Sequence, residues 1–456
     1  MYDMKIINGK IVDFKANGFK NCDIGIKNGK IITIGNCTEL AKIEIDAKNK
    51  IISPGFIDIH MHEELIGETV DSNGYDIANK MLLMGATTCV GGNCGNNKQD
   101  IKVFFDYIDK NGAPVNYIMF IGHNYLRQKV GIDNRYRKAT ESEIDDMKKM
   151  VSTAIDEGAI GISFGLEYAP GVDSDEVIKV CSGLNNKKAI LSAHYRSDAM
   201  DGIESIKELI EISKKTNLPM QISHIGSCTA MGMMKESLEI IQKAIDEKID
   251  IGADCYPYDA FSTFIGSAVF DEGCFERWNK SYDSILLTEE PYKGVRCDKE
   301  LFYKVRKEYP NMIVVAFVMN EDEVIEAIKA PFVSVASDGL YRKGQGHPRG
   351  AGTFPRVLGK YVRDMKKLTL IDALEKMTIL PAERIGLVGK GRIEEGMDGD
   401  LVIFDYEKIC DGATFENPIK QPKGIEYVIV NGQIAVKNNE IINSALGKSI
   451  RREDFF

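Results

Sequence analysis

The alternation of apolar and polar positions divides the chain into two regions of short strands around a long central region. Residues 1–52 have the pattern of short strands joined by turns, and Asn-Gly pairs at Asn8-Gly9 and Asn28-Gly29 predict β-hairpins. Residues 386–456 return to this pattern, with another hairpin predicted at Asn431-Gly432. The two ends either form two separate β appendages or pair into one small β-sandwich domain, which is the favoured interpretation.

The central region, residues 53–385, alternates apolar strand-like runs with longer amphipathic segments such as SEIDDMKKMVSTAIDEG. This alternation is typical of βαβ units around a parallel sheet. Eight such units predict an α/β fold of the (β/α)8 TIM-barrel type, with an active site at the C-terminal ends of the strands. The expected strands are 54–62, 86–94, 116–123, 159–166, 189–196, 220–225, 250–257 and 332–338.

One connection is too long for an ordinary barrel loop. Residues 259–331 separate the seventh and eighth expected strands and contain the only tryptophan of the chain. Long connections inside a compact domain are usually functional loops or lids. We therefore expect residues 259–311 to form a lid insertion over the barrel mouth.

Composition and charge narrow the class of function. The chain has 456 residues, 44% hydrophobic and 28% charged, which is ordinary for a globular protein. Its net charge of −10 argues against a nucleic-acid partner. No apolar run approaches the roughly 20 residues that span a bilayer, no signal-peptide pattern is present, and the ten cysteines are scattered. We expect a cytoplasmic protein with reduced thiols and no membrane partner; nothing excludes an oligomer.

Metal-binding side chains recur where the expected strands end. The first strand ends in HMH, and residues i and i+2 of a strand lie on one face, so His60 and His62 can bind the same ion. Cys94 follows the second strand among glycines that allow close backbone approach. Imidazole and thiolate are zinc ligands, and a carboxylate adds an acceptor. The side chains expected to converge are His60, His62, Cys94, His194, His224 and Asp338.

Each of these residues also has an ordinary structural explanation. A single histidine at a strand end is more often packed or solvent-facing, a buried cysteine is usually a small apolar residue, and Asp338 could cap a helix. The recurrence of the same position on five strands favours the metal site. His123 either lines the pocket or is structural, and His347 is expected to be structural or to contact substrate.

The stretches SPGFIDIHMHEE and GATTCVGGNCG resemble the amidohydrolase superfamily, and within it the D-aminoacylases (N-acyl-D-amino-acid deacylases). The NCG turn and the late HPR…GTFPR segment carry the specific signal, and similar stretches cover almost the whole chain. The resemblance implies a tight zinc site at Cys94, His194 and His224. It implies a second, weakly filled site at His60, His62 and Asp338. Many relatives bridge two metals with a carboxylated lysine of strand four; this strand has no lysine here, and Cys94 takes its place.

The resemblance also implies hydrolysis of a linear amide, an N-acyl-D-amino acid, to a carboxylate and a D-amino acid. Zinc lowers the pKa of a water ligand from 15.7 to about 7. Asp338 is the expected general base for that water and then the acid for the leaving amine. The substrate carboxylate is expected to contact Tyr168, Tyr256 and Ser262.

One departure from the family pattern concerns the substrate carboxylate. Relatives commonly carry a lysine two residues after the histidine of strand six, and this position is Gly226 here. Either Arg196, Arg349 or Lys235 supplies the positive charge from elsewhere, or the substrate differs. Of these, Arg196 is expected to bind the substrate carboxylate.

Two other functions remain open. A cyclic-amide hydrolase of the hydantoinase or dihydroorotase type would share the fold, but the absent bridging lysine and the NCG turn count against it. A non-catalytic scaffold on the same barrel is the second alternative, and the complete set of candidate ligands counts against it.

Overall fold

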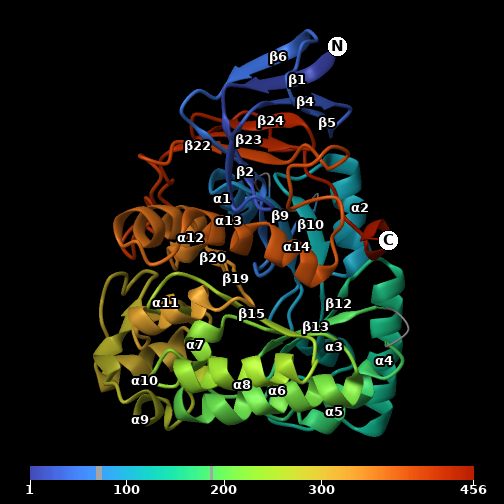
Figure 1. Cartoon of the computed structure of the whole chain (residues 1–456). Coiled ribbons are helices and arrows are strands. Elements are labelled where there is room, and N and C mark those ends of the chain that lie inside the picture. The colour runs from blue at the N-terminus through green and yellow to red at the C-terminus, as the bar shows by residue number, and fades with distance from the viewer. Residues whose placement is uncertain (68–73, 185–187, 456) are drawn as a thin grey trace.

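Both ends of the chain meet in a β-rich layer that lies beside a parallel α/β unit (Figure 1). The computed structural model describes residues 1–67, 74–184 and 188–455. In Figure 1 the N-terminal strands and the last strands of the chain, blue and red, stack at the top, and the α/β unit lies beneath them. The central region therefore lies next to a domain to which both ends of the sequence contribute.

Eight parallel strands form the barrel predicted from the sequence. They are short apolar runs whose residues are all buried, as expected for a parallel sheet covered on both faces. Register pairs run in one direction from each strand to the next. A parallel bridge between Met61 and Gly339 joins the first strand region to the last and closes the ring. The strands are β8 (Phe56–Asp58), β9 (Ala86–Gly91), β10 (Asn116–Met119) continued by β11 (Ile121–Gly122), β12 (Gly161–Gly165), β13 (Ile190–His194), β14 (Met220–Ile222), β15 (Ile251–Cys255) and β19 (Val333–Val335).

Helices follow the barrel strands and cover the outside of the ring (Figure 1). The amphipathic segment singled out in the sequence is the helix α4, which begins after a Thr140–Glu143 capping box. The helices are α1 (Asp76–Leu83), α2 (Ile101–Asn111), α3 (His123–Lys129), α4 (Glu141–Asp156), α5 (Ser174–Cys181), α6 (Gly202–Thr216), α7 (Ile225–Thr229), α8 (Met234–Asp246), α11 (Glu321–Lys329), α12 (Arg349–Arg356), α13 (Leu370–Met377) and α14 (Ile379–Ile385).

The two ends of the chain pair into one β-sandwich, which confirms the favoured interpretation over separate appendages. Leu401 pairs with Pro54 in an antiparallel register that joins the C-terminal strands to the N-terminal ones. One sheet contains β25 (Glu440–Ile441), β24 (Gln433–Lys437), β23 (Ile425–Val430), β22 (Leu401–Phe404), β7 (Ile51–Pro54), β2 (Lys10–Asp13) and β3 (Gly18–Asn21). The other contains β5 (Lys30–Gly35), β4 (Asp23–Lys27), β1 (Tyr2–Ile7) and β6 (Ala41–Asp46).

Two of the three predicted Asn-Gly hairpins exist, and the prediction at Asn8-Gly9 is wrong. Asn28-Gly29 joins the antiparallel pair β4 and β5, and Asn431-Gly432 joins β23 and β24. Asn8-Gly9 instead lies between strands of different sheets, since β1 pairs with β4 and β6 while β2 pairs with β3 and β7. A Cβ on Gly9 would lie 2.2 Å from the Cδ1 of Ile52. The glycine therefore serves close packing where the chain crosses between sheets.

The long connection before β19 folds as a unit with its own antiparallel sheet and aromatic core. Its strands are β16 (Phe261–Phe264), β17 (Ile285–Leu287) and β18 (Ile313–Ala316), in the order β16-β18-β17, and its helices are α9 (Cys274–Trp278) and α10 (Lys299–Glu308). We call residues 259–317 the insertion. The lid role and the domain boundaries at residues 52 and 385 stay predictions.

Within the described residues, no helix is long and apolar enough to cross a membrane.

Candidate metal centre

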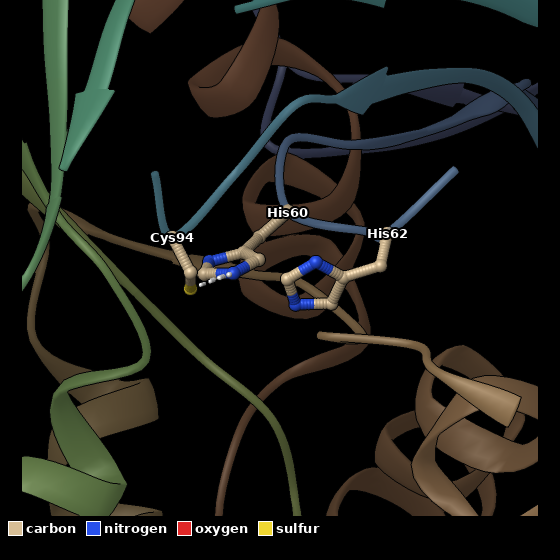
Figure 2. Close-up of side chains that lie close together, drawn as sticks. All are labelled: His60, His62 and Cys94. Atoms are coloured by element: carbon tan, nitrogen blue, oxygen red, sulfur yellow. Dashed lines mark hydrogen bonds between the residues drawn. The ribbon is translucent and has the colours of Figure 1, made fainter. Parts of the chain in front are cut away.

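The six candidate ligands lie at or just beyond the C-terminal ends of five barrel strands. His60 and His62 follow β8, Cys94 follows β9, and the others end or follow β13, β14 and β19. Figure 2 shows that the imidazoles of His60 and His62 and the thiol of Cys94 point into the same space. The backbone is left-handed at Cys94 (φ 52°), His224 (φ 34°) and Asp338 (φ 48°), a conformation that residues other than glycine adopt rarely and that clusters at functional sites.

Cys94, His194 and His224 form one compact group of donors. The Sγ of Cys94 lies 3.5 Å from the Nε2 of His224, and the Nδ1 of His194 lies 3.0 Å from the same nitrogen. One donor atom from each residue lies within 4.8 Å of the others. Ligands that share a tetrahedral zinc at bond lengths of about 2.0–2.3 Å stand roughly 3.3–3.8 Å apart. The donor set therefore fits one ion.

His60, His62 and Asp338 form a second group that borders the first. Asp338 Oδ1 lies 3.0 Å from the Nε2 of His62 and 3.5 Å from that of His60. The Nε2 of His60 also lies 3.3 Å from the Sγ of Cys94 (Figure 2). The thiol thus lies between the two groups, where a ligand shared by two ions would be.

The second nitrogen of three histidines is held by a buried polar group. The Nδ1 of His60 lies 3.1 Å from Asp254 Oδ1, and the Nε2 of His194 lies 2.9 Å from Glu167 Oε2. The Nδ1 of His224 lies 2.8 Å from the hydroxyl of Ser227. Metal-binding histidines usually have such partners, which fix the ring and leave the other nitrogen free to bind. The other ring nitrogens, Nε2 of His60, Nδ1 of His194 and Nε2 of His224, are the ones that face Cys94.

The charged side chains of this group shift one another's pKa values. Burial opposes ionisation of the Cys94 thiol, but His60 and hydrogen bonds from the neighbouring histidines hold its pKa well below the usual range. Burial also opposes ionisation of Asp338, yet Arg349 and His60 hold the pKa of this carboxyl well below its usual range. For His60, burial lowers the pKa, but Asp254 and Cys94 raise it well above the ordinary value. Thiolate and carboxylate are the forms that bind a metal ion.

A cavity of about 490 Å³ opens onto this group. Its wall includes His62, Cys94, Asp338 and Arg349, and it extends to the insertion. The guanidinium of Arg349 is buried, stacks 4.5 Å from the ring of Tyr256, and pairs with Asp338 Oδ2 at 2.9 Å. Its Nε has no hydrogen-bond partner within the described part of the chain. The Nε–H of Arg349 is therefore available as a hydrogen-bond donor beside the candidate metal centre.

The amidohydrolase family model matches residues 44–273 and 322–436, and most of the unmatched stretch between them, residues 274–321, belongs to the insertion. The chain belongs to the amidohydrolase family. It is 30% identical over 481 residues to a D-aminoacylase of Alcaligenes xylosoxydans xylosoxydans, covering 99% of this chain and 98% of that protein.

Two solved structures of deacylases also resemble this chain over nearly its whole length. A D-aminoacylase crystal structure, described as defining a novel subset of amidohydrolases, superposes with a TM-score of 0.89 at 28% identity, covering 99% of this chain and 100% of that one. N-acyl-D-glutamate deacylase of Bordetella bronchiseptica, solved with zinc and a phosphonate inhibitor that mimics the tetrahedral intermediate, superposes with a TM-score of 0.88 at 28% identity, covering 99% of each chain. The present amidohydrolase is a metal-dependent enzyme related to the D-aminoacylases.

Of the four residues predicted to bind the substrate, three line the spaces beside the candidate metal centre of this amidohydrolase and one does not. Tyr168 and Ser262 line the large cavity, and Tyr256 joins them around a narrow extension of about 20 Å³ beside His194. Arg196 lies outside the described walls of both spaces, because its guanidinium bonds Glu208 and the carbonyl of Val172. Its carboxylate-binding role stays a prediction.

Gly226, where relatives carry a lysine, lies in a packed part of the barrel. A Cβ there would lie 3.0 Å from both Cys255 Sγ and Met319 Cε. A lysine at this position would require both neighbours to move. The packing around Gly226 therefore leaves little room for a side chain at this position.

Three polar partners of the candidate ligands were not identified from the sequence: Glu167, Asp254 and Ser227. A signal was present for the two carboxylates, since Glu167 follows β12 and Asp254 lies near the end of β15. Both positions lie toward the C-terminal ends of their strands, which is the end of the barrel where active sites lie in this fold. Ser227 follows His224 by three residues in α7 and gave no separate signal.

The two remaining histidines, His123 and His347, are absent from the walls of both spaces described above. His123 is buried 3.2 Å from Glu176 Oε1 and against the ring of Phe164. The Nε2 of His347 contacts the carbonyl of Ala260 at 3.0 Å, while its Nδ1 accepts from the backbone N–H of Arg349. His347 therefore fixes the start of α12, on which Arg349 lies.

Proposed function

We propose that this amidohydrolase cleaves the amide bond of N-acyl-D-amino acids to release a carboxylate and a D-amino acid. The observation that carries the proposal is the buried Cys94–His194–His224 donor group next to an Asp338–Arg349 pair, with Cys94, Asp338 and Arg349 on the wall of one cavity. This arrangement combines a metal centre, a proton acceptor and a carboxylate-binding cation. A linear amide with a free carboxylate uses all three.

Zinc is the proposed metal because two imidazoles and one thiolate are a typical zinc donor set. Cys94, His194 and His224 would hold the tight ion, and His60, His62 and Asp338 would hold a second, weaker one. When bound, zinc polarises the amide carbonyl and lowers the pKa of water, which supplies several kcal/mol of transition-state stabilisation.

Asp338 is the proposed general base and acid. Its backbone N–H donates to the carbonyl of His60 at 2.7 Å, and Arg349 and His62 hold its side chain. Because its pKa is held low, the carboxylate is ionised at neutral pH and can accept a proton from the attacking water. Asp338 can then return that proton to the leaving nitrogen, since the attacking water and the leaving nitrogen would both lie at the face of the cavity next to Asp338.

Arg349 is the proposed anchor of the substrate carboxylate, in place of the lysine that relatives carry at the position of Gly226. Guanidinium groups bind carboxylates through two parallel hydrogen bonds, and Arg349 has an unsatisfied Nε beside the cavity. The hydroxyls of Tyr168 and Ser262 lie on the same wall. The ring of Tyr256 stacks on the guanidinium and helps to hold it in place.

Replacing Arg349 with methionine is expected to lower kcat/KM for N-acyl-D-amino acids by about 30-fold or more, because a desolvated charge pair with the substrate is lost. The loss should be smaller for N-acyl amines, which have no carboxylate. Arg356→Met is the matched control, since Arg356 lies on the same helix and stacks 4.5 Å from Tyr258. Equal losses for substrates with and without the carboxylate would contradict the anchor role.

A paired screen tests the proposed function. Zinc-loaded enzyme is incubated with N-acetyl-D-amino acids, their L-enantiomers and a hydantoin, and release of free amine or ring opening is measured. We expect turnover of the D-series above the L-series. Hydantoin turnover with no release from any N-acetyl-D-amino acid would instead indicate a cyclic-amide hydrolase, and no turnover of any compound would favour a scaffold.

A further inference from the structure

The ring of His194 is fixed by a carboxylate that lies on a different strand. Glu167 follows β12, and its Oε2 lies 2.9 Å from the Nε2 of His194. Backbone hydrogen bonds from the N–H groups of Leu166 and Glu167 to the carbonyls of His194 and Tyr195 align the two segments. With Nε2 donating to Glu167, the Nδ1 of His194 is directed at His224 and the metal position.

The other oxygen of Glu167 contacts a residue of the insertion. The Nη2 of Arg277, on α9, lies 3.6 Å from Glu167 Oε1. The Nε of Arg277 donates to Asp198 Oδ1, and the indole of Trp278 donates to Asp198 Oδ2 at 2.6 Å. Glu167 and Asp198 are 6% and 1% exposed, so two carboxylates of the barrel are buried against one arginine of the insertion.

Burial makes this arrangement sensitive to the loss of the arginine. Two neighbouring carboxylates repel each other, and taking either out of water costs several kcal/mol unless a cation compensates. Arg277 is the cation that contacts both. Its place is set by the aromatic core of the insertion, where Trp278 packs against Phe261 and Phe270.

We propose that Glu167 is the positioning residue of His194, and that Arg277 of the insertion holds Glu167 in place and so sets the zinc affinity of the site. The inference rests on the proposed metal centre. It gives the insertion a role besides the predicted covering of the barrel mouth: docking of α9 completes a chain of contacts from Arg277 through an ion pair to Glu167 and from Glu167 to His194. Undocking of α9 weakens the metal site through this chain.

The first step of the proposal is that Glu167 positions His194. Measuring the zinc affinity of the folded apoprotein tests this step. The dissociation constant is measured by competition with a chromophoric zinc chelator, and thermal unfolding of each apoprotein confirms the fold. We expect Glu167→Ala to weaken zinc binding by about 10–100-fold, the usual effect of removing such a partner. Glu167→Gln, which keeps an acceptor for Nε2 but loses the charge, should fall between Glu167→Ala and wild type.

Arg277→Met tests the second step, with Arg306→Met as its control. Arg306 is also an arginine of the insertion, but it bonds Ser267, Phe270 and Asp271 within the insertion itself. We expect Arg277→Met to weaken zinc binding and Arg306→Met to leave it unchanged. In the Glu167→Ala background, Arg277→Met should cause no further loss, because both residues act through one chain of contacts.

Three results would overturn the inference. One is tight zinc binding by folded Glu167→Ala at the wild-type affinity. Another is an equal loss in Arg277→Met and Arg306→Met, which would indicate general loosening of the insertion. The third is full additivity in the double variant. A wild-type chain that binds no zinc would contradict the proposed metal centre as well, which separates the two failures.

Discussion

Asp338→Asn is expected to lower kcat for an N-acetyl-D-amino acid by about 10²–10⁴-fold, the usual contribution of a positioned general acid–base. Asparagine keeps the size of the side chain but cannot accept the proton of the attacking water. Zinc content should stay near the wild-type level, because Cys94, His194 and His224 are unchanged. Steady-state kinetics and metal analysis of the same preparation measure both quantities.

Asp405→Asn is the matched control for this variant. Asp405 is also a buried, ion-paired aspartate, but its partner is Lys50 in the β-sandwich. Its replacement should leave kcat unchanged, even if it lowers stability. Wild-type turnover by Asp338→Asn would rule out the assigned acid–base role. Loss of the tight zinc in that variant would instead place Asp338 among the ligands of that ion.

Cys94→Ala is expected to abolish tight zinc binding and to reduce kcat/KM by more than about a thousandfold, since several kcal/mol of transition-state stabilisation depend on the ion. The thiolate is the ligand that contacts both donor groups. Its removal leaves only neutral imidazoles in the proposed tight site. Zinc titration followed by an activity assay at saturating zinc measures the two effects.

Cys89→Ala provides the control on the same strand. Cys89 is completely buried in β9, burial raises the pKa of its thiol well above the usual range, and it belongs to none of the donor groups of the candidate metal centre. Its replacement should cost about 1 kcal/mol of stability with unchanged zinc affinity. A Cys94→Ala variant that retains tight zinc and activity would contradict the proposed ligand set.

The barrel and the convergence of the candidate ligands at one end of it were predictable because both follow from local sequence pattern. Short apolar runs separated by amphipathic segments specify strands and helices, and parallel closure brings every strand end to one rim. His60, Cys94 and Asp338 could therefore be grouped although they are far apart in sequence. The sequence could not show which nitrogen of each histidine faces inward, because that depends on partners such as Asp254 from another strand.

The errors and omissions have a common physical origin. Asn8-Gly9 has the composition of a hairpin turn, but the chain changes sheets there because Gly9 must pack against Ile52. Arg196, Arg349 and Lys235 could all be named as candidates for the substrate carboxylate, but only tertiary contacts show that Arg196 pairs with Glu208 while Arg349 lies on the cavity wall. The sequence signals for turns and charges are local. Packing between distant segments decides which turn forms a hairpin and which charged side chain faces the cavity.

Anomalous diffraction at the zinc absorption edge, from crystals of the gently purified protein, tests the central claim most directly. The account predicts one strong peak about 2.3 Å from the Sγ of Cys94 and about 2.0–2.1 Å from the Nδ1 of His194 and the Nε2 of His224. A map with no zinc peak bounded by these three atoms, or with its only peak elsewhere in the molecule, would contradict the account.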